Sequence, residues 1–480
     1  MIPVRRALLY VLMLLVFGVA IVAVLKLGSS LPAPAAEPLA GSARTAPLAG
    51  HDSALGHLLL QLLVIIVAAR GIGHVFKRFG QPAVVGEMAA GIFLGPSLFG
   101  LLAPEAFAFV FPEGSLGTLK LLSQIGVCFF MFTVGMEVDL RHVRGKAEAA
   151  VAVSHASILF PYLLGVILAY YLFTDLAAPG AAFMPFALFM GISMSITAFP
   201  VLARILQERR LSKTSLGRTA LTCAAVGDVT AWTILAFVVA IAEATSLRGA
   251  TASFGLVIVF VAAMIFGARR VLPRWTGADR LGSGEPAAGV LAMVACVVVG
   301  AALATEMIGI HALFGAFLAG VIMPEAHDFR HKIAVRIENF SSVLLLPLFF
   351  AFTGLRTPIG LLGDLEGWLL CLLIVVVATL GKLGGSAVAA RVTGMSWSEA
   401  LQLGALMNTR GLMELIALNI GYDLGLLSPR IFAMLVVMAL VTTALTGPLL
   451  TLFGMRHATA TTGLTSGSAS GTPRAPRREA

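Results

Sequence analysis

Asp228 stands in the middle of a long apolar run, SLGRTALTCAAVGDVTAWTILAFVVAIA, which extends over residues 215–242. A charged side chain at the centre of a bilayer costs about 2.5–3.5 kcal/mol on insertion scales, so such residues usually line a pathway or pair with one another. Burial favours the neutral form of a carboxyl group. A carboxyl poised in this way can hold a proton or a dehydrated cation, but not both, and such competition is sufficient to couple the movements of the two ions. The alternative is an acid satisfied by hydroxyl and backbone donors, but Thr230 is the only nearby hydroxyl.

Lys382 lies in a second apolar run, VVVATLGKLGGSAVAA, and is flanked by Gly381, Gly384 and Gly385. Small residues at these positions permit close approach of neighbouring helices. A buried ammonium group needs a partner or must lose its proton, and Asp228 is the best candidate partner that the sequence offers. A lysine that snorkels to an interface is the alternative, and the number of apolar residues on both sides of Lys382 disfavours it.

Arg410 and Glu414 are four residues apart in GALMNTRGLMELIALNIG, so on a helix they share one face and can pair. Such a pair either takes part in an ion site or stabilises the helix without touching the ion, and the sequence leaves both readings open. Glu87, Glu137 and Asp139 lie near expected cytoplasmic helix ends and are interpreted as structural. Glu306 and His311 flank a short outer turn, and the sequence alone does not make them functional.

The composition decides what kind of protein holds these charges. The chain has 480 residues, of which 59% are hydrophobic and 12% are charged, and its mean hydropathy is +0.96. A soluble domain could not bury so much apolar surface, so a multi-pass membrane protein is predicted. The net charge of +9 is concentrated in short loops such as HVFKR, QERRLSK and GARRVLPR. Such clusters are typical of cytoplasmic loops, and they require no nucleic-acid partner.

The apolar runs predict an all-α protein with about 13 transmembrane helices, at about 20 residues per crossing. Residues 1–36 are either a signal peptide or an extra N-terminal helix, residues 37–54 form an extracytoplasmic linker, and residues 454–480 form a disordered cytoplasmic tail. The basic loops follow every second helix, which places the C-terminus inside. The expected helices are 55–76, 83–102, 116–138, 149–173, 183–206, 215–243, 252–271, 285–305, 308–323, 338–355, 367–390, 398–421 and 430–453.

Two expected helices, 183–206 and 398–421, contain polar and helix-breaking residues. If the seventh helix is a connector, each of these two is the fifth helix of a six-helix half, and the halves have opposite orientation. Paired interrupted helices in an inverted repeat indicate the ion site of a secondary transporter near the middle of the membrane. One such helix alone would be unremarkable, because membrane helices often tolerate these residues. The residues expected to line the interruptions are Ser195, Thr197, Asn408 and Thr409.

Several motifs of the chain, taken together and in order, resemble those of monovalent cation:proton antiporters. The branch that they resemble most is the Kef-type and plant cation/proton exchanger group. The resemblance extends from about residue 55 to about residue 453. It is carried by the motifs QPAVVGEMAAGIFLGPS, MFTVGMEVDLR, SMSITAFPVLARIL, GIHALFGAFLAGVIMP, LPLFFAFTGLRT, GKLGG and MNTRGLMELIALNIG.

The resemblance implies a homodimer in which a core part moves against a dimer part. The core part carries two crossed, interrupted helices, which here would be those that contain Thr197 and Asn408. Mapped onto this chain, the dimer part covers about 55–140 and 285–355, and the core part covers about 149–243 and 367–453. The ion-binding carboxylate is expected to be Asp228, with Thr197 as a further ligand of the monovalent cation, and the core lysine is expected to be Lys382. The transported ions would be Na⁺ or K⁺ and H⁺. No cofactor is expected, and the expected location is the cytoplasmic membrane of a bacterium.

The residue before the expected ion-binding acid departs from the family pattern. Many members of the family carry two adjacent acids or an Asn-Asp pair, whereas this chain has Gly227 before Asp228. A single titrating carboxyl favours one-for-one exchange, unless Lys382 also releases a proton in each cycle.

Other functions remain to be weighed against exchange. A passive cation channel is the main alternative, because interrupted helices and a buried acid can also line a pore. A solute symporter on a related inverted-repeat fold is a third reading. Intramembrane aspartyl proteolysis is disfavoured, because Ala225 replaces the first glycine of a Gly-x-Gly-Asp motif and the Tyr422-Asp423 pair follows Asp228 along the chain. The chain is therefore not expected to be an enzyme.

Overall fold

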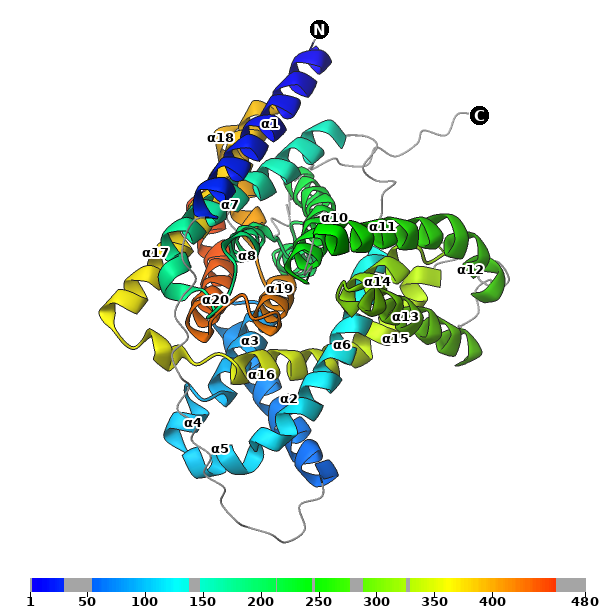
Figure 1. The fold of residues 1–480 in the computed structure, drawn as a ribbon, viewed down its shortest axis with the longest axis vertical. Coiled ribbons are helices and arrows are strands. Elements are labelled where there is room, and N and C mark those ends of the chain that lie inside the picture. The colour runs from blue at the N-terminus through cyan, green and yellow to red at the C-terminus, as the bar shows by residue number, and fades with distance from the viewer. Residues whose placement is uncertain are drawn as a thin grey trace, which may run out of the picture.

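The computed structural model describes residues 2–29, 54–137, 147–212, 214–243, 247–276, 288–324 and 329–454. These residues are almost entirely helical, and within them the one β-feature is an isolated bridge between Ala177 and Leu427 (Figure 1). The α-helices are α1 (Ile2–Gly28), α2 (Ala54–Arg78), α3 (Ala83–Leu94), α4 (Phe99–Leu102), α5 (Pro104–Val110), α6 (Leu116–Glu137), α7 (Ala147–Leu176), α8 (Phe183–Ser195), α9 (Phe199–Glu208), α10 (Ser215–Glu243), α11 (Leu247–Ala262), α12 (Arg269–Thr276), α13 (Ala288–Ile308), α14 (Ala312–Val321), α15 (Phe329–Phe340), α16 (Leu346–Leu355), α17 (Leu365–Val392), α18 (Trp397–Met407), α19 (Leu412–Asp423) and α20 (Pro429–Leu452).

Ten spans in the described part of the chain are long and apolar enough to cross a membrane. They account for ten of the expected helices. The other three expected segments contain shorter helices: α14 in 308–323, α16 in 338–355, and α18 with α19 in 398–421. An all-helical multi-pass fold is therefore confirmed, whereas the number of about 13 crossings stays a prediction.

The two halves of the chain pack against each other reciprocally. Helix α3 of the first half packs on α16 of the second, and α6 of the first half packs on α14 of the second. Each contact is made by a glycine at which the backbones nearly touch. A Cβ atom on Gly91 would lie 2.1 Å from the Phe350 carbonyl oxygen, and a Cβ atom on Gly320 would lie 2.1 Å from the Phe132 carbonyl oxygen. Matched contacts of this kind are what an inverted repeat produces.

Helices α7 and α17 pack along each other and bring the two interrupted helices together. Helix α7 also packs on α8, and α17 also packs on α18. The turns beyond α7 and α19 are joined as well, because the Ala178 amide donates to the Leu426 carbonyl oxygen at 3.3 Å. Figure 1 shows α7, α8, α17 and α20 gathered on one side, with α2, α4 and α5 at the opposite end.

The first helix, α1, packs on α7 and α8. The Phe17 and Phe160 rings meet edge to face with their centroids 5.8 Å apart. Residues 2–28 are therefore helical in this structure, and both readings of residues 1–36, signal peptide or extra helix, stay predictions. The linker up to residue 53 and the tail from residue 455 lie outside the described residues, as does Asp139.

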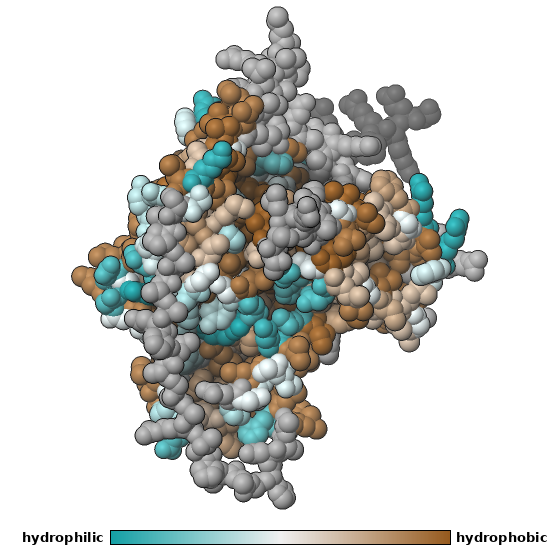
Figure 2. Space-filling model, in the orientation of Figure 1, coloured by the Kyte–Doolittle hydropathy of each residue, from teal (hydrophilic) through white to brown (hydrophobic). Residues whose placement is uncertain are grey.

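The outer surface of the bundle is apolar over long helix faces. On α17, for example, Leu369, Leu372, Val376 and Leu380 are all exposed. Figure 2 shows apolar surface around much of the rim of the view and hydrophilic residues nearer its centre. An exposed apolar face of this extent on long helices is expected where lipid is the solvent.

Candidate functional site

The first interruption separates α8 from α9. Residues 196–198 leave the helix, with Ile196 and Ala198 in extended conformations. Pro200 stands in the first turn of α9, and it accounts for this interruption. Proline has no amide to donate, and its ring collides with the carbonyl four residues earlier.

The second interruption separates α18 from α19 and includes Asn408–Gly411. Gly411 has a φ of +155°, a conformation that residues with side chains rarely adopt. A Cβ atom at this position would also lie 2.8 Å from Cγ2 of Val201 on α9. A glycine is therefore required both by the turn and by the close approach of the two interrupted helices.

The two interruptions lie directly against each other. The Ala198 amide donates to the Thr409 carbonyl oxygen at 3.0 Å. The Thr197 hydroxyl donates to the Met407 carbonyl oxygen at 3.1 Å. The backbone groups freed by one break are thus partly satisfied by the other. The place where residues 196–198 contact residues 407–411 is called the crossing.

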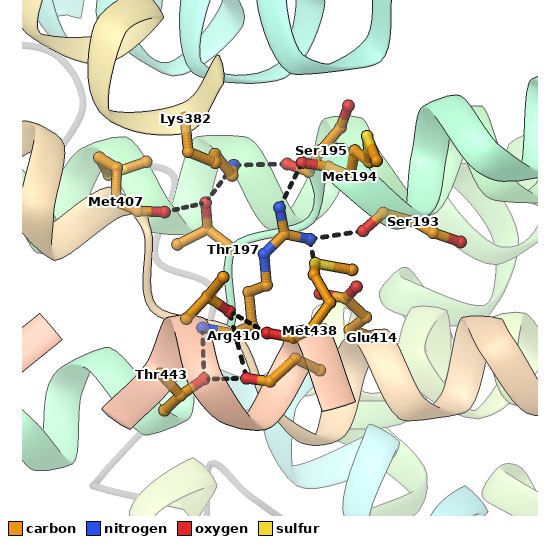
Figure 3. A network of polar contacts seen from close by, with 12 residues as sticks. Ser193, Met194, Ser195, Thr197, Lys382, Met407, Arg410, Glu414, Met438 and Thr443 are labelled. Carbon is orange, nitrogen blue, oxygen red and sulfur yellow. Dashed lines mark hydrogen bonds and ion pairs between the residues drawn. The ribbon is translucent and has the colours of Figure 1, made fainter. Parts of the chain in front are cut away.

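Two cationic side chains satisfy the last three carbonyl oxygens of α8 (Figure 3). Arg410 donates from Nη1 to the Ser193 carbonyl oxygen at 2.5 Å and from Nη2 to the Met194 carbonyl oxygen at 2.7 Å. Lys382 donates to the Ser195 carbonyl oxygen. The C-terminal end of a helix carries partial negative charge, and cations stabilise it. Lys382 and Arg410 therefore hold the interrupted end of α8 in place.

Lys382 makes two further hydrogen bonds, to the Ser157 carbonyl oxygen at 3.0 Å and to the Thr197 hydroxyl oxygen at 2.5 Å. Its side chain is completely buried. The contacts that position Lys382 are thus oxygens of α7 and of the first interruption, and its direct pairing with Asp228 stays a prediction.

The glycines beside Lys382 behave differently from one another. A Cβ atom on Gly381 would lie 3.1 Å from Pro161, and one on Gly385 would lie 2.9 Å from Cβ of Phe160, so both allow α17 to approach α7. Gly384 faces open space. The expectation of close helix approach is therefore confirmed at Gly381 and Gly385 and is wrong at Gly384, because that position points away from α7.

Arg410 and Glu414 form a completely buried ion pair, with 2.7 Å between Nη1 and Oε2. The Arg410 amide also donates to the Thr443 hydroxyl oxygen on α20 at 3.1 Å. Of the two readings that the sequence left open, these contacts favour stabilisation of the interrupted helices, because Arg410 joins the end of α8 to the start of α19.

Asp228 lies on α10 with 2% of its surface exposed. Helix α10 packs on α7, α8, α9 and α18, so this carboxylate belongs to the same group of helices as the crossing. Several buried polar atoms of α7, α8, α17 and the second interruption have no hydrogen-bond partner among the described residues: the Ser154, Ser193 and Ser386 hydroxyls and the Asn408 side-chain amide. Neutral oxygens together with one acid form a ligand set that suits a monovalent cation. In the described part of the chain, no three His, Cys, Asp or Glu side chains converge as a metal site.

Glu87 and Glu306 are acids that the sequence does not assign to the ion site. Glu87 is 6% exposed on α3 and lies 3.6 Å from Arg70, and its interpretation as a structural acid stays a prediction. The helix α2 covers it, which the sequence pattern of α3 alone did not indicate. Glu306 accepts from the Ala312 amide, and His311 accepts from the Leu313 amide, so both cap the start of α14.

A charged cluster at the end of α19 was not predicted from the sequence. Asp423 lies 3.0 Å from Lys120 on α6 and 2.5 Å from Arg356 at the end of α16. Arg356 also donates to the Asn419 side-chain oxygen at 3.3 Å and stacks on the Tyr422 ring. The feature of the sequence that stands out here is the Tyr422-Asp423 dipeptide. The residues around it in the sequence do not indicate that its partners lie on α6 and α16.

Comparison with known proteins identifies the family. A family model described as "Sodium/hydrogen exchanger, transmembrane" matches residues 62–456, which is most of the chain. The chain belongs to this family. The match covers all the helices from the middle of α2 to the end of α20, including both interruptions.

Similar proteins include antiporters from several kingdoms. The chain is 44% identical over 397 residues to the Na(+)/H(+) antiporter NhaS4 of Synechocystis, covering 82% of this chain and 96% of that protein. It is 38% identical to cation/H(+) antiporter 17 of Arabidopsis thaliana and 32% identical to K(+)/H(+) antiporter 1 of Saccharomyces cerevisiae, with 83% of this chain covered in each case. It spans about half the length of the plant and yeast proteins, 48% and 46%.

The fold is similar to that of a solved structure, the sodium proton antiporter MjNhaP1 from Methanocaldococcus jannaschii. The TM-score is 0.57, the sequence identity is 16%, and the match covers 84% of this chain and all of that chain. At this identity the likeness concerns the fold.

Proposed function

We propose that this protein is a secondary active antiporter that exchanges a monovalent cation, Na⁺ or K⁺, for protons across the membrane. The observation that carries the proposal is Asp228, a carboxylate buried on α10 within the group of helices that forms the crossing of the two interruptions. The names of the family and of its similar members, which are Na⁺/H⁺, K⁺/H⁺ and cation/H⁺ antiporters, support the same reaction class. They do not favour a passive channel.

Asp228 is the group for which proton and cation compete. In its neutral form it holds a proton, and in its charged form it binds the cation together with the Thr197 hydroxyl oxygen. Ser195, Asn408 and Thr409 line the crossing, and Lys382 supplies positive charge near the site. Lys382 and Arg410 keep α8 interrupted, and this role is supported by their hydrogen bonds to its last three carbonyl oxygens.

Alternating access is proposed to come from movement of a core part against a dimer part. The core part is about 149–243 and 367–453, and the dimer part is about 55–140 and 285–355 of a homodimer. The buried network between α7, α8, α17 and the two interruptions supports a core that moves as one body. The proposed location is the cytoplasmic membrane of a bacterium with the C-terminus inside.

The proposal is tested with the purified protein in liposomes that carry a preformed pH gradient. Adding Na⁺ or K⁺ outside should dissipate the gradient, and Asp228→Asn should abolish this response, because an amide cannot exchange a proton for a cation. Full activity of Asp228→Asn would overturn the site. Cation current without an imposed proton gradient would establish a channel in place of an exchanger.

A further inference from the structure

The gap left by Gly227 is occupied from another helix. A Cβ atom built on Gly227 would meet a single heavy atom within 4 Å, the hydroxyl oxygen of Ser154 on α7, at 3.2 Å. Gly227 immediately precedes Asp228 on α10 and is itself buried. The space beside the candidate ion-binding acid is therefore bordered by a hydroxyl group.

The Ser154 hydroxyl has no hydrogen-bond partner among the described residues, although its side chain is completely buried. Two nearby hydroxyls donate back to the chain, whereas those of Ser193 and Ser386, like that of Ser154, have no partner among the described residues. Thr230 donates to the Val226 carbonyl oxygen at 2.9 Å, and Ser157, three residues after Ser154, donates to the Ser154 carbonyl oxygen at 2.8 Å. Leaving a buried polar group unsatisfied costs about 1–3 kcal/mol. A buried hydroxyl that is left unsatisfied next to the residue that precedes an acid is suited to bind a ligand.

The same stretch of α7 contacts the other elements of the site. The Ser157 carbonyl oxygen accepts from Lys382 at 3.0 Å, and the Ile158 carbonyl oxygen accepts from the Ser195 hydroxyl at 3.0 Å. This segment of α7 thus lies between α10, α17 and the first interruption. Within the segment, Ser154 is the residue that faces α10.

We propose that Ser154 is a further ligand of the transported cation, and that its hydroxyl oxygen stands in for the side chain missing at Gly227. A hydroxyl oxygen has lone pairs that can coordinate a cation without adding charge. With Asp228 as the one acidic ligand, the site then carries the same net charge whether it holds one monovalent cation or one proton. The role of Ser154 rests on the proposed function, and it specifies how the site would exchange one cation for one proton.

The test compares four proteins in the same liposome assay: wild type, Ser154→Ala, Thr230→Val and the double variant Ser154→Ala/Gly227→Ser. The concentration of Na⁺ or K⁺ that gives half of the maximal response is measured for each. Ser154→Ala should raise this concentration about tenfold, the size of one polar contact to a charged group. Thr230→Val is the matched control, because its hydroxyl is engaged by its own helix, and it should resemble wild type. The double variant moves a hydroxyl from α7 to α10 into the same gap and should recover most of the loss.

A second measurement detects binding of the cation in the absence of transport. Na⁺ or K⁺ should raise the thermal unfolding midpoint of the purified wild type, and a weaker ligand set reduces that shift at equal cation concentration. Ser154→Ala should show a smaller shift than Thr230→Val. Equal half-maximal concentrations and equal thermal shifts for Ser154→Ala and Thr230→Val would overturn the role of Ser154 while leaving exchange intact. Absence of exchange in the wild type would instead overturn the proposed function.

Discussion

Among the described residues, one arginine–carboxylate pair at a helix N-terminus lies inside the bundle and another lies at its surface. In the buried pair, Glu414 lies in the first turn of α19 and binds Arg410, and neither side chain is exposed. In the surface pair, Asp364 caps α17 and binds Arg430 at 3.0 Å, and the two side chains are 59% and 35% exposed. The chemistry is the same, and burial is what differs.

Burial decides how much each pair contributes. Exposed pairs are screened by water and salt and contribute little, whereas removing one member of a buried pair leaves an uncompensated charge. Arg410 also satisfies two carbonyl oxygens of α8, and the residues that carry them, Ser193 and Met194, are completely buried. The interior pair therefore fixes the geometry of the two interruptions, and the surface pair stabilises the start of one helix.

The largest effect is expected from Arg410→Ala. It leaves Glu414 buried without its partner and frees the Ser193 and Met194 carbonyl oxygens, so the protein should lose roughly 3–5 kcal/mol of stability. Thermal unfolding of the purified protein in detergent, with Arg430→Ala as the surface control, measures the difference. A midpoint for Arg410→Ala equal to that of Arg430→Ala would show that burial does not separate the two pairs.

An intermediate effect is expected from Thr197→Val at the crossing. The valine keeps the shape but cannot donate to the Met407 carbonyl oxygen or accept from Lys382. The neutral bond to Met407 contributes about 1 kcal/mol and the bond from the Lys382 ammonium about 1.5–3 kcal/mol. No charge is left buried without its partner in this variant, so the unfolding midpoint should fall by less than in Arg410→Ala. The half-maximal cation concentration should rise as well, because Thr197 is a proposed ligand. An unchanged cation concentration would remove Thr197 from the ligand set.

The sequence predicts much of this site because its signals are local. Pro200 and Gly411 mark the two interruptions, and the spacing of Arg410 and Glu414 predicts their pairing. The contacts of Lys382 could not be predicted, since its acceptors lie on α7 and α8, about 190–225 residues earlier in the chain. Ser154 and the cluster at Asp423 were missed for the same reason. A hydroxyl in an apolar run, or an acid at a helix end, becomes informative only when the fold shows what it faces.

The smallest effect is expected from Asp364→Asn at the surface. Asparagine can still cap α17, so only the carboxylate charge is lost. The hydrogen bond from the Gly367 amide, and then the Arg430 guanidinium, hold the pKa of Asp364 below its ordinary value of 3.8. A carboxyl with a lowered pKa in the folded protein stabilises it above the unfolded value, and this contribution is lost as the pH falls through the folded value. The unfolding midpoint of wild type should therefore exceed that of Asp364→Asn by a small, constant amount from neutral pH down to about pH 5, and the difference should shrink below about pH 4.

High salt at neutral pH should also reduce the difference in unfolding midpoint between wild type and Asp364→Asn. It should leave the lower midpoint of Arg410→Ala nearly unchanged, because screening ions do not reach a buried pair. A salt dependence as large for Arg410→Ala as for Asp364→Asn would contradict the distinction between the two pairs.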